Sequence, residues 1–307
     1  MLDVIFAILP IFLLILIGLG MRRWNFPGEA FWPLADRSVY FLFFPALLIH
    51  NLARADLGDL DPTGLFGTLF GSILLIAVIG YSLRRPLKLD GPAFTSLFQG
   101  SIRFNTFVGF GAVAALSGNA GITLYAVVIS VAIPVLNILT VLVMMRFGSH
   151  AQGGASLRDQ FFALAKNPLI IACLVGIFLN QTGIGLPRGI DAVFKTLGDV
   201  AAPLGLLTVG AALQLDALRR GGPAVAATLV LKLLLYPAAM FGLARLWHLT
   251  LLETQVLVLW AMLPTSSASY ILARQMGGDA PLMAAIVTAT TLGAFITMPI
   301  LLGLMGL

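Results

Sequence analysis

The chain has 307 residues, of which 59% are hydrophobic and only 10% are charged, whereas soluble domains carry about 25% charged residues. With a mean hydropathy of +1.01, this balance excludes a water-soluble globular protein and predicts an all-α polytopic membrane protein. The net charge of +5 does not indicate nucleic-acid binding, because Lys and Arg gather in short clusters beside the apolar runs, as in proteins that orient themselves in a membrane.

Apolar runs that could cross a hydrocarbon core of about 30 Å recur along the whole chain. Polar residues and Gly/Pro breaks divide these runs into ten predicted transmembrane helices. The first five are expected near Val4–Met21, Val39–Leu52, Gly64–Leu83, Ala93–Leu116 and Ile122–Met145. The second five are expected near Leu169–Gln181, Val193–Leu215, Ala224–Trp247, Val256–Ala273 and Leu282–Leu304. Residues 1–150 and 167–307 thus form two halves, joined by a short linker at 151–166.

The basic residues divide unequally between the two sides that this map defines. One side collects Arg22, Arg23, Arg37, Arg84, Arg85, Lys88, Arg146, Arg158, Lys166, Arg219, Arg220 and Arg274. The other side collects only Arg54, Arg188, Lys195 and Arg245. By the positive-inside rule the richer side is cytoplasmic, so both termini are expected to face outward.

The two halves share a register of prolines and glycines. Pro10, Gly18 and Pro45 recur at identical spacing as Pro168, Gly176 and Pro203, and Gly118-Asn119-Ala120 corresponds to Gly278-Asp279-Ala280. Because each half has an odd number of spans, the two copies must enter the bilayer in opposite senses. Inverted repeats of this kind are common in secondary transporters, whose substrate site lies near the midplane.

Polar residues and helix breakers interrupt the fourth and ninth spans at matching depth. Asn105 and Pro264 stand at nearly the same distance from the first proline of their halves. Backbone that is not helical at membrane depth is tolerated only where it is buried in protein or lines a watery cavity. We therefore expect two broken helices around one cavity. The expected helix-breaking positions are Pro45, Gly109, Pro203 and Pro264.

The residues at these breaks are candidates for binding an anion. The guanidinium of Arg103 matches the planar geometry of a carboxylate, although it could instead cap helix carbonyls or extend toward the cytoplasm. Asn105 offers an amide, whose alternative role is a hydrogen bond between helices. Hydroxyls and a helix N-terminus in the ninth span also favour anions. The predicted substrate-binding residues are Arg103, Asn105, Thr106, Asn137, Pro264, Thr265, Ser266 and Ser267.

Few residues indicate ion coupling. Asp199 is the carboxylate expected to approach a span interior, with an interfacial position near the outer end as the alternative. Lys232 lies about one third of the way into its span and is expected to extend to the interface. The sequence shows no His, Cys and carboxylate spacing typical of a metal site, and no cofactor is predicted.

Several motifs together resemble the auxin efflux carrier family of membrane transporters, in its bacterial branch. They are RFNT at 103–106, PVLN at 134–137, NPLIIACLVGIFLN at 167–180, APLGLLTVGAAL at 202–213 and LPTSSASYILARQMGGDA at 263–280. The resemblance implies ten helices in two inverted five-helix repeats, similar to bile acid and sodium symporters, with helices four and nine crossing. Helices 1, 2, 6 and 7 would form a scaffold, and helices 3–5 and 8–10 a transport domain.

The resemblance also implies a function. It predicts a carrier that exports a small organic anion, such as a carboxylate or an auxin-like compound, across the bacterial cytoplasmic membrane as a homodimer. A sodium-coupled symporter and an anion channel are the alternatives. A membrane-embedded hydrolase would need a base beside a nucleophile, and no histidine is expected at the depth of Ser266.

Overall fold

The computed structural model describes residues 2–55, 62–149, 168–220 and 222–307, and the regular elements in these ranges are helices. The expected linker at 151–166, with Arg158 and Lys166, lies outside the described residues. Seven helices in the described ranges are long and apolar enough to cross a membrane. The protein is therefore a helical, polytopic membrane protein.

The first half contains five stretches of helix. They are α1 (Leu2–Arg23), the continuous run of α2 (Phe31–Ser38), η1 (Val39–Phe43) and α3 (Phe44–Leu52), α4 (Pro62–Ser82), α5 (Gly91–Ile102) and α6 (Thr106–Phe147). The long helix α6 is divided at Gly118, whose φ of 58° and ψ of −153° are not helical.

The second half follows the same general order. Its elements are α8 (Pro168–Gln181), α9 (Arg188–Ala212), η2 (Leu215–Arg220), the run of α10 (Pro223–Val230), η3 (Leu231–Leu235) and α11 (Tyr236–Leu246), then α12 (Leu251–Met262), α13 (Ala268–Met276) and α14 (Ala280–Met305).

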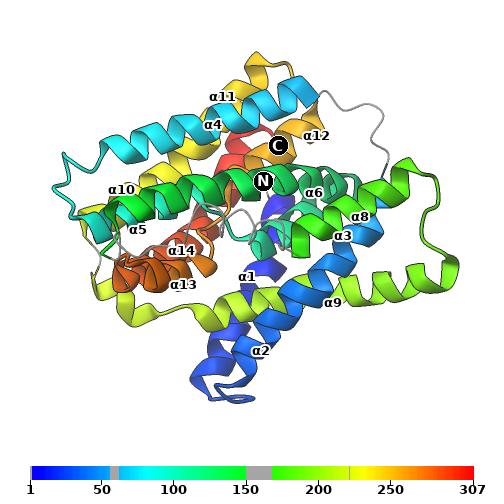
Figure 1. Cartoon of the computed structure of the whole chain (residues 1–307), viewed down its shortest axis with the longest axis horizontal. Coiled ribbons are helices and arrows are strands. Elements are labelled where there is room, and N and C mark those ends of the chain that lie inside the picture. The colour runs from blue at the N-terminus through cyan, green and yellow to red at the C-terminus, as the bar shows by residue number, and fades with distance from the viewer. Residues whose placement is uncertain (1, 56–61, 150–167, 221) are drawn as a thin grey trace.

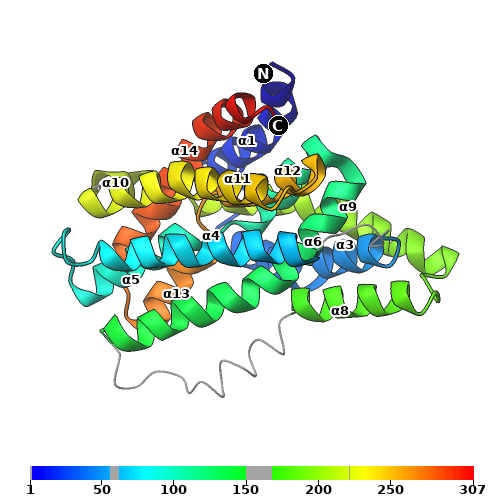
Figure 2. The ribbon, with the colours of Figure 1, turned by 90° about the horizontal axis from the view of Figure 1, so that it is seen from above.

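The helices pack in two groups. Helix α1 packs against α9, and α3 packs against both α8 and α9. In the other group, α4 runs beside α5 and α11 along the long axis of the molecule, and α12 packs against α11 and α6 (Figures 1 and 2). The N-terminus and the C-terminus lie close together in both views.

Two unwound segments meet inside this arrangement. Helix α5 ends at Ile102 and α6 begins at Thr106, while α12 ends at Met262 and α13 begins at Ala268. The backbone N–H of Asn105 donates a hydrogen bond to the carbonyl of Pro264 at 2.8 Å. The two interruptions are thus in direct contact.

Thr265 fixes the second segment to its neighbours. Its hydroxyl donates to the carbonyl of Gly100 at 2.7 Å, and its backbone N–H donates to Oγ1 of Thr290 in α14 at 3.1 Å. Gly100 lies in the last turn of α5, where carbonyls have no donor from their own helix. The hydroxyl therefore supplies a partner that the broken helix has lost.

Three of the four expected helix breaks are corrected by the structure. Pro45 lies at the start of α3 directly after the π-helical turn η1, and the helical run continues through it. Pro203 lies inside the continuous helix α9. Gly109 lies inside α6, where a Cβ would come within 1.8 Å of the Tyr125 hydroxyl, so its role there is close packing. Only Pro264 lies in an unwound segment.

Lys232 does not extend to the membrane interface, contrary to expectation. Its side chain is fully buried in η3, and Nζ lies 4.6 Å from the ring centroid of Tyr236 and 5.9 Å from that of Trp260. Neighbouring helices cover this face, so the side chain cannot reach water. Cation–π attraction to the two rings replaces part of the lost hydration.

We predict that Thr265→Val destabilises the protein by about 1–3 kcal/mol, because the buried carbonyl of Gly100 loses its donor. Thr228→Val is the matched control, since the equally buried Thr228 hydroxyl bonds only within its own helix, to Ala224 at 2.8 Å. Thermal unfolding in detergent should show a larger loss for the Thr265 variant. Equal losses would contradict a special role for this contact.

Candidate functional site

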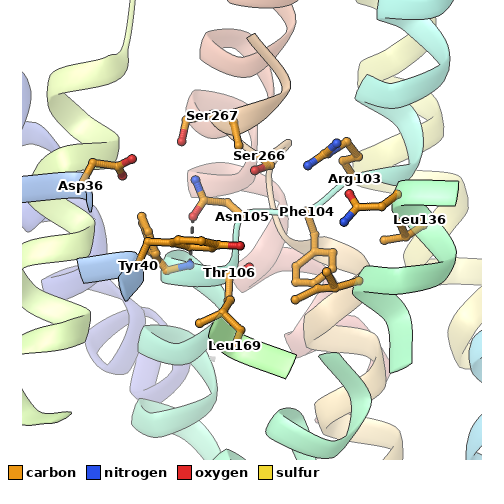
Figure 3. Close-up of a pocket in the computed structure, with 14 residues that line it drawn as sticks. Asp36, Tyr40, Arg103, Phe104, Asn105, Thr106, Leu136, Leu169, Ser266 and Ser267 are labelled. Carbon is orange, nitrogen blue, oxygen red and sulfur yellow. Dashed lines mark hydrogen bonds between the residues drawn. The ribbon is translucent and has the colours of Figure 1, made fainter. Parts of the chain in front are cut away.

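A cavity of about 190 Å³ lies beside the two unwound segments. Its walls come from four parts of the fold, as Figure 3 shows for most of them. They are Asp36, Tyr40 and Leu169 from the first group of helices, Arg103–Phe107 from the first unwound segment, Ile133, Leu136 and Asn137 from α6, and Ser266–Ala268 from the second unwound segment. The cavity therefore lies between the two groups of helices.

The structure brings together most of the residues that the sequence indicated. Arg103, Asn105, Thr106, Asn137, Ser266 and Ser267 line the cavity. Pro264 and Thr265 do not line it. Thr265 is fully buried, and the carbonyl of Pro264 accepts the hydrogen bond from the backbone N–H of Asn105. These two residues shape the crossing, and their neighbours supply the cavity wall.

Arg103 presents a guanidinium to the cavity. Its backbone is extended, with φ −76° and ψ 153°, because α5 has just ended. In Figure 3 the nitrogen atoms of its side chain point toward Ser266. Among the described residues no carboxylate oxygen lies within 4 Å of its side chain, and no protein hydrogen bond holds it. This positive charge is therefore available to a ligand.

Asn105 has a structural role as well as a place in the wall. Its Oδ1 accepts hydrogen bonds from the backbone N–H groups of Phe107 at 3.1 Å and Val108 at 3.2 Å, which caps the N-terminus of α6. Such a cap typically stabilises a helix by about 1 kcal/mol. The carboxamide oxygen is thus committed to the fold, and only Nδ2 remains to donate to a ligand.

Two helix N-termini face the cavity, and they differ. Helix α6 is capped by Asn105, whereas Ser267, at the N-cap of α13, makes no side-chain hydrogen bond to that helix. The start of a helix carries a partial positive charge that favours anions, although in α13 the N–H groups of Ser269 and Tyr270 already donate to the carbonyls of Ser266 and Ser267, both at 3.1 Å. The α13 terminus therefore adds to the positive potential of Arg103.

Sequence reasoning missed Asp36 and Tyr40. The second span was expected to begin at Val39, which left Asp36 outside it, but the helix begins at Phe31 and brings Asp36 into the cavity wall together with Tyr40. The length of the expected span Val39–Leu52 could have indicated the missing turns, because it is shorter than the roughly 20 residues that a membrane crossing needs.

Asp199 has a different environment from the one proposed for a coupling residue. Its side chain is 63% exposed and pairs with Lys195 at 2.8 Å, one turn earlier in α9. It lines neither the cavity beside the unwound segments nor the larger cavity that adjoins it. Asp36, and not Asp199, is the carboxylate of the cavity wall.

A second cavity, of about 540 Å³, adjoins the first and is called the vestibule below. The two cavities share Asp36, Ser267 and Ala268. The vestibule wall also includes Arg22 and Arg274, at the ends of α1 and α13. The inner cavity thus adjoins a larger cavity whose wall contains these two arginines.

Comparisons with known proteins agree with a transport role. The family described as "Membrane transport protein" matches residues 3–302. A protein of Methanothermobacter thermautotrophicus named "Uncharacterized transporter" is 26% identical over 308 residues, covering 96% of this chain and 96% of its own length. A protein of Rhizobium meliloti named "Putative malonate transporter" is 26% identical over 313 residues, covering 95% of this chain and 92% of its own. The chain belongs to the membrane transport protein family, the family of the auxin efflux carriers that its motifs resemble.

Proposed function

We propose that the protein is a secondary carrier that moves a small organic anion across the bacterial cytoplasmic membrane by alternating access. The observation that carries this proposal is the guanidinium of Arg103, which faces the cavity without a carboxylate within 4 Å among the described residues. A charge at membrane depth is costly and marks a substrate or ion pathway. An anion would supply the missing partner.

The cavity size and the relatives favour a short carboxylate as the anion. About 190 Å³ is below the roughly 300–1,000 Å³ of sites that enclose drug-sized ligands. One relative at 26% identity is named for malonate. We therefore propose malonate as the first compound to test, with other small mono- and dicarboxylates after it. Export is expected when the anion is more concentrated in the cytoplasm.

A plan of ten helices in two inverted repeats supports alternating access, and several contacts favour it. The pair α1 and α9 corresponds under this plan to the pair α8 and α3, and both pairs pack together. Glycines with positive φ, Gly118 at 58° and Gly277 at 73°, precede the last span of each half and lie one residue apart in the repeat register. We propose that α1–α3, α8 and α9 form the scaffold and that the remaining helices form the transport domain.

The membrane orientation follows from the same plan. Arg22 and Arg274 of the vestibule belong to the larger group of basic residues, which the positive-inside rule assigns to the cytoplasm. The vestibule would then open to the cytoplasm and the structure would represent an inward-facing state. Both termini, which lie close together in Figures 1 and 2, would face outward. From the family resemblance we also propose a homodimer formed through the scaffold helices.

Arg103→Gln should weaken malonate binding by about 10- to 150-fold, because a charge-assisted contact contributes on the order of 1.5–3 kcal/mol. Arg103→Lys should retain more affinity if only the charge matters, and as little as Gln if two hydrogen bonds are needed. Arg245→Gln, at an exposed position outside both cavities, is the control. Isothermal titration of purified protein measures each affinity, and an unchanged affinity in Arg103→Gln would refute the site.

Asn105→Asp should separate the helix cap from ligand binding. Aspartate is as good an N-cap as asparagine, so the melting temperature should change little. The new negative charge and the loss of the Nδ2 donor should lower malonate affinity at least tenfold, since like charges repel in a site of low dielectric. Parallel thermal unfolding and titration would check both effects. Undiminished binding would show that the anion does not contact this residue.

The orientation can be tested by cysteine labelling in intact cells, after Cys173→Ala removes the native thiol. Cysteines at positions 188 and 245 should react with a membrane-impermeant maleimide. Those at positions 84 and 219 should react only after the cells are opened. Labelling of position 84 or 219 from outside would reverse the proposed orientation.

A further inference from the structure

Asp36 stands at the junction between the inner cavity and the vestibule. It lines both, together with Ser267 and Ala268. In the view of Figure 3, Asp36 projects from α2 on the side of the cavity opposite Arg103, with Asn105 and Ser266 between them. An anion that moves from the vestibule to Arg103 by way of this junction would therefore pass this carboxylate.

The carboxylate of Asp36 is weakly held by the protein. The hydroxyl of Thr208 in α9 lies at 3.5 Å from Oδ1, a long contact for a hydrogen bond. No Lys, Arg or His nitrogen lies within 4 Å of it among the described residues. The titratable and charged side chains that share its two cavities are Tyr40, Arg103, Arg22, Glu29, Tyr270 and Arg274. Of these, Arg22 already pairs with Glu29 at 3.4 Å.

A carboxylate in this place conflicts with an anionic ligand. Two negative charges in one partly buried site repel, and the neutral acid becomes the favoured form of one of them. A protonated Asp36 would also offer an O–H donor to the anion, where the carboxylate offers only acceptors. Ligand binding and protonation of Asp36 would thus favour each other, and by linkage the effect is reciprocal.

We propose that Asp36 takes up one proton when the anion binds, so that the carrier moves an anion and a proton together. This inference rests on the proposed carrier function and adds its coupling ion. The proton comes from water in the vestibule and binds a carboxylate oxygen of Asp36, and no covalent bond of the anion changes. Where the proton gradient is directed into the cell, this coupling favours uptake of the anion over the export expected from the family.

The test is the number of protons taken up on malonate binding. Isothermal titration in buffers of different ionisation enthalpy, at pH values where malonate is fully ionised, should give about one proton per malonate for the wild type. The affinity of the wild type for malonate should then fall about tenfold for each unit by which the pH is raised. In Asp36→Asn the uptake should vanish and the affinity should lose its pH dependence, whereas Asp36→Glu should retain both. Asp199→Asn, which changes an exposed carboxylate outside both cavities, should behave as the wild type.

The outcomes separate this inference from the carrier function. Malonate binding to the wild type without proton uptake overturns the role of Asp36 and leaves the anion site intact, whether or not the variants fold. Uptake that persists in Asp36→Asn assigns the proton to another group and also overturns it. A wild-type protein that binds neither malonate nor any other small carboxylate of a screened panel contradicts the proposed function and the coupling together.

Discussion

The site depends on the contact between two interrupted helices, where the N–H of Asn105 donates to the carbonyl of Pro264. A helix that unwinds at membrane depth frees polar backbone groups, and lipid offers them no partner. Here that bond pairs one group of each interruption, the Thr265 hydroxyl bonds the Gly100 carbonyl in the last turn of α5, and Thr290 of α14 accepts the N–H of Thr265. The two breaks are tolerated because they lie against each other and against α14.

The same contact explains the charge distribution of the cavity. By ending α5 at Ile102 and starting α6 and α13 beside one another, the crossing places Arg103 and two helix N-termini around one space. All three are sources of positive potential. The negative charge of Asp36 stands at the entrance, on a helix of the other group. An anion would be attracted to the crossing and would meet a titratable carboxylate on the way.

The sequence predicted the presence of the helices better than their ends. Hydropathy located the apolar runs, and the polar residues from Arg103 to Thr106 and from Pro264 to Ser267 located the two unwound segments. Asp36 was missed because the polar run Asp36-Arg37-Ser38 follows the short apolar segment at 31–35, and hydropathy places the start of the span after that run. The packing of α2 against α9 is a tertiary effect that no local pattern contains.

The predictions for Pro45 and Lys232 were wrong for a related reason. A proline predicts a helix break from its missing N–H and its ring, but the wider turn of η1 before Pro45 accommodates the ring within a continuous run. Lys232 was expected to reach the interface from its depth alone. Its burial depends on Tyr236, one helical turn away, and on Trp260 of α12, and the contact with Trp260 becomes visible only in three dimensions.

The central claim is that the crossing of the unwound segments holds the anion, and a structure of the carrier with bound malonate tests it most directly. The account predicts ligand density in the inner cavity, with a carboxylate beside the guanidinium of Arg103 and within reach of Ser266 and the start of α13. Density at any place that does not contact Arg103, with this cavity left to water, would contradict it.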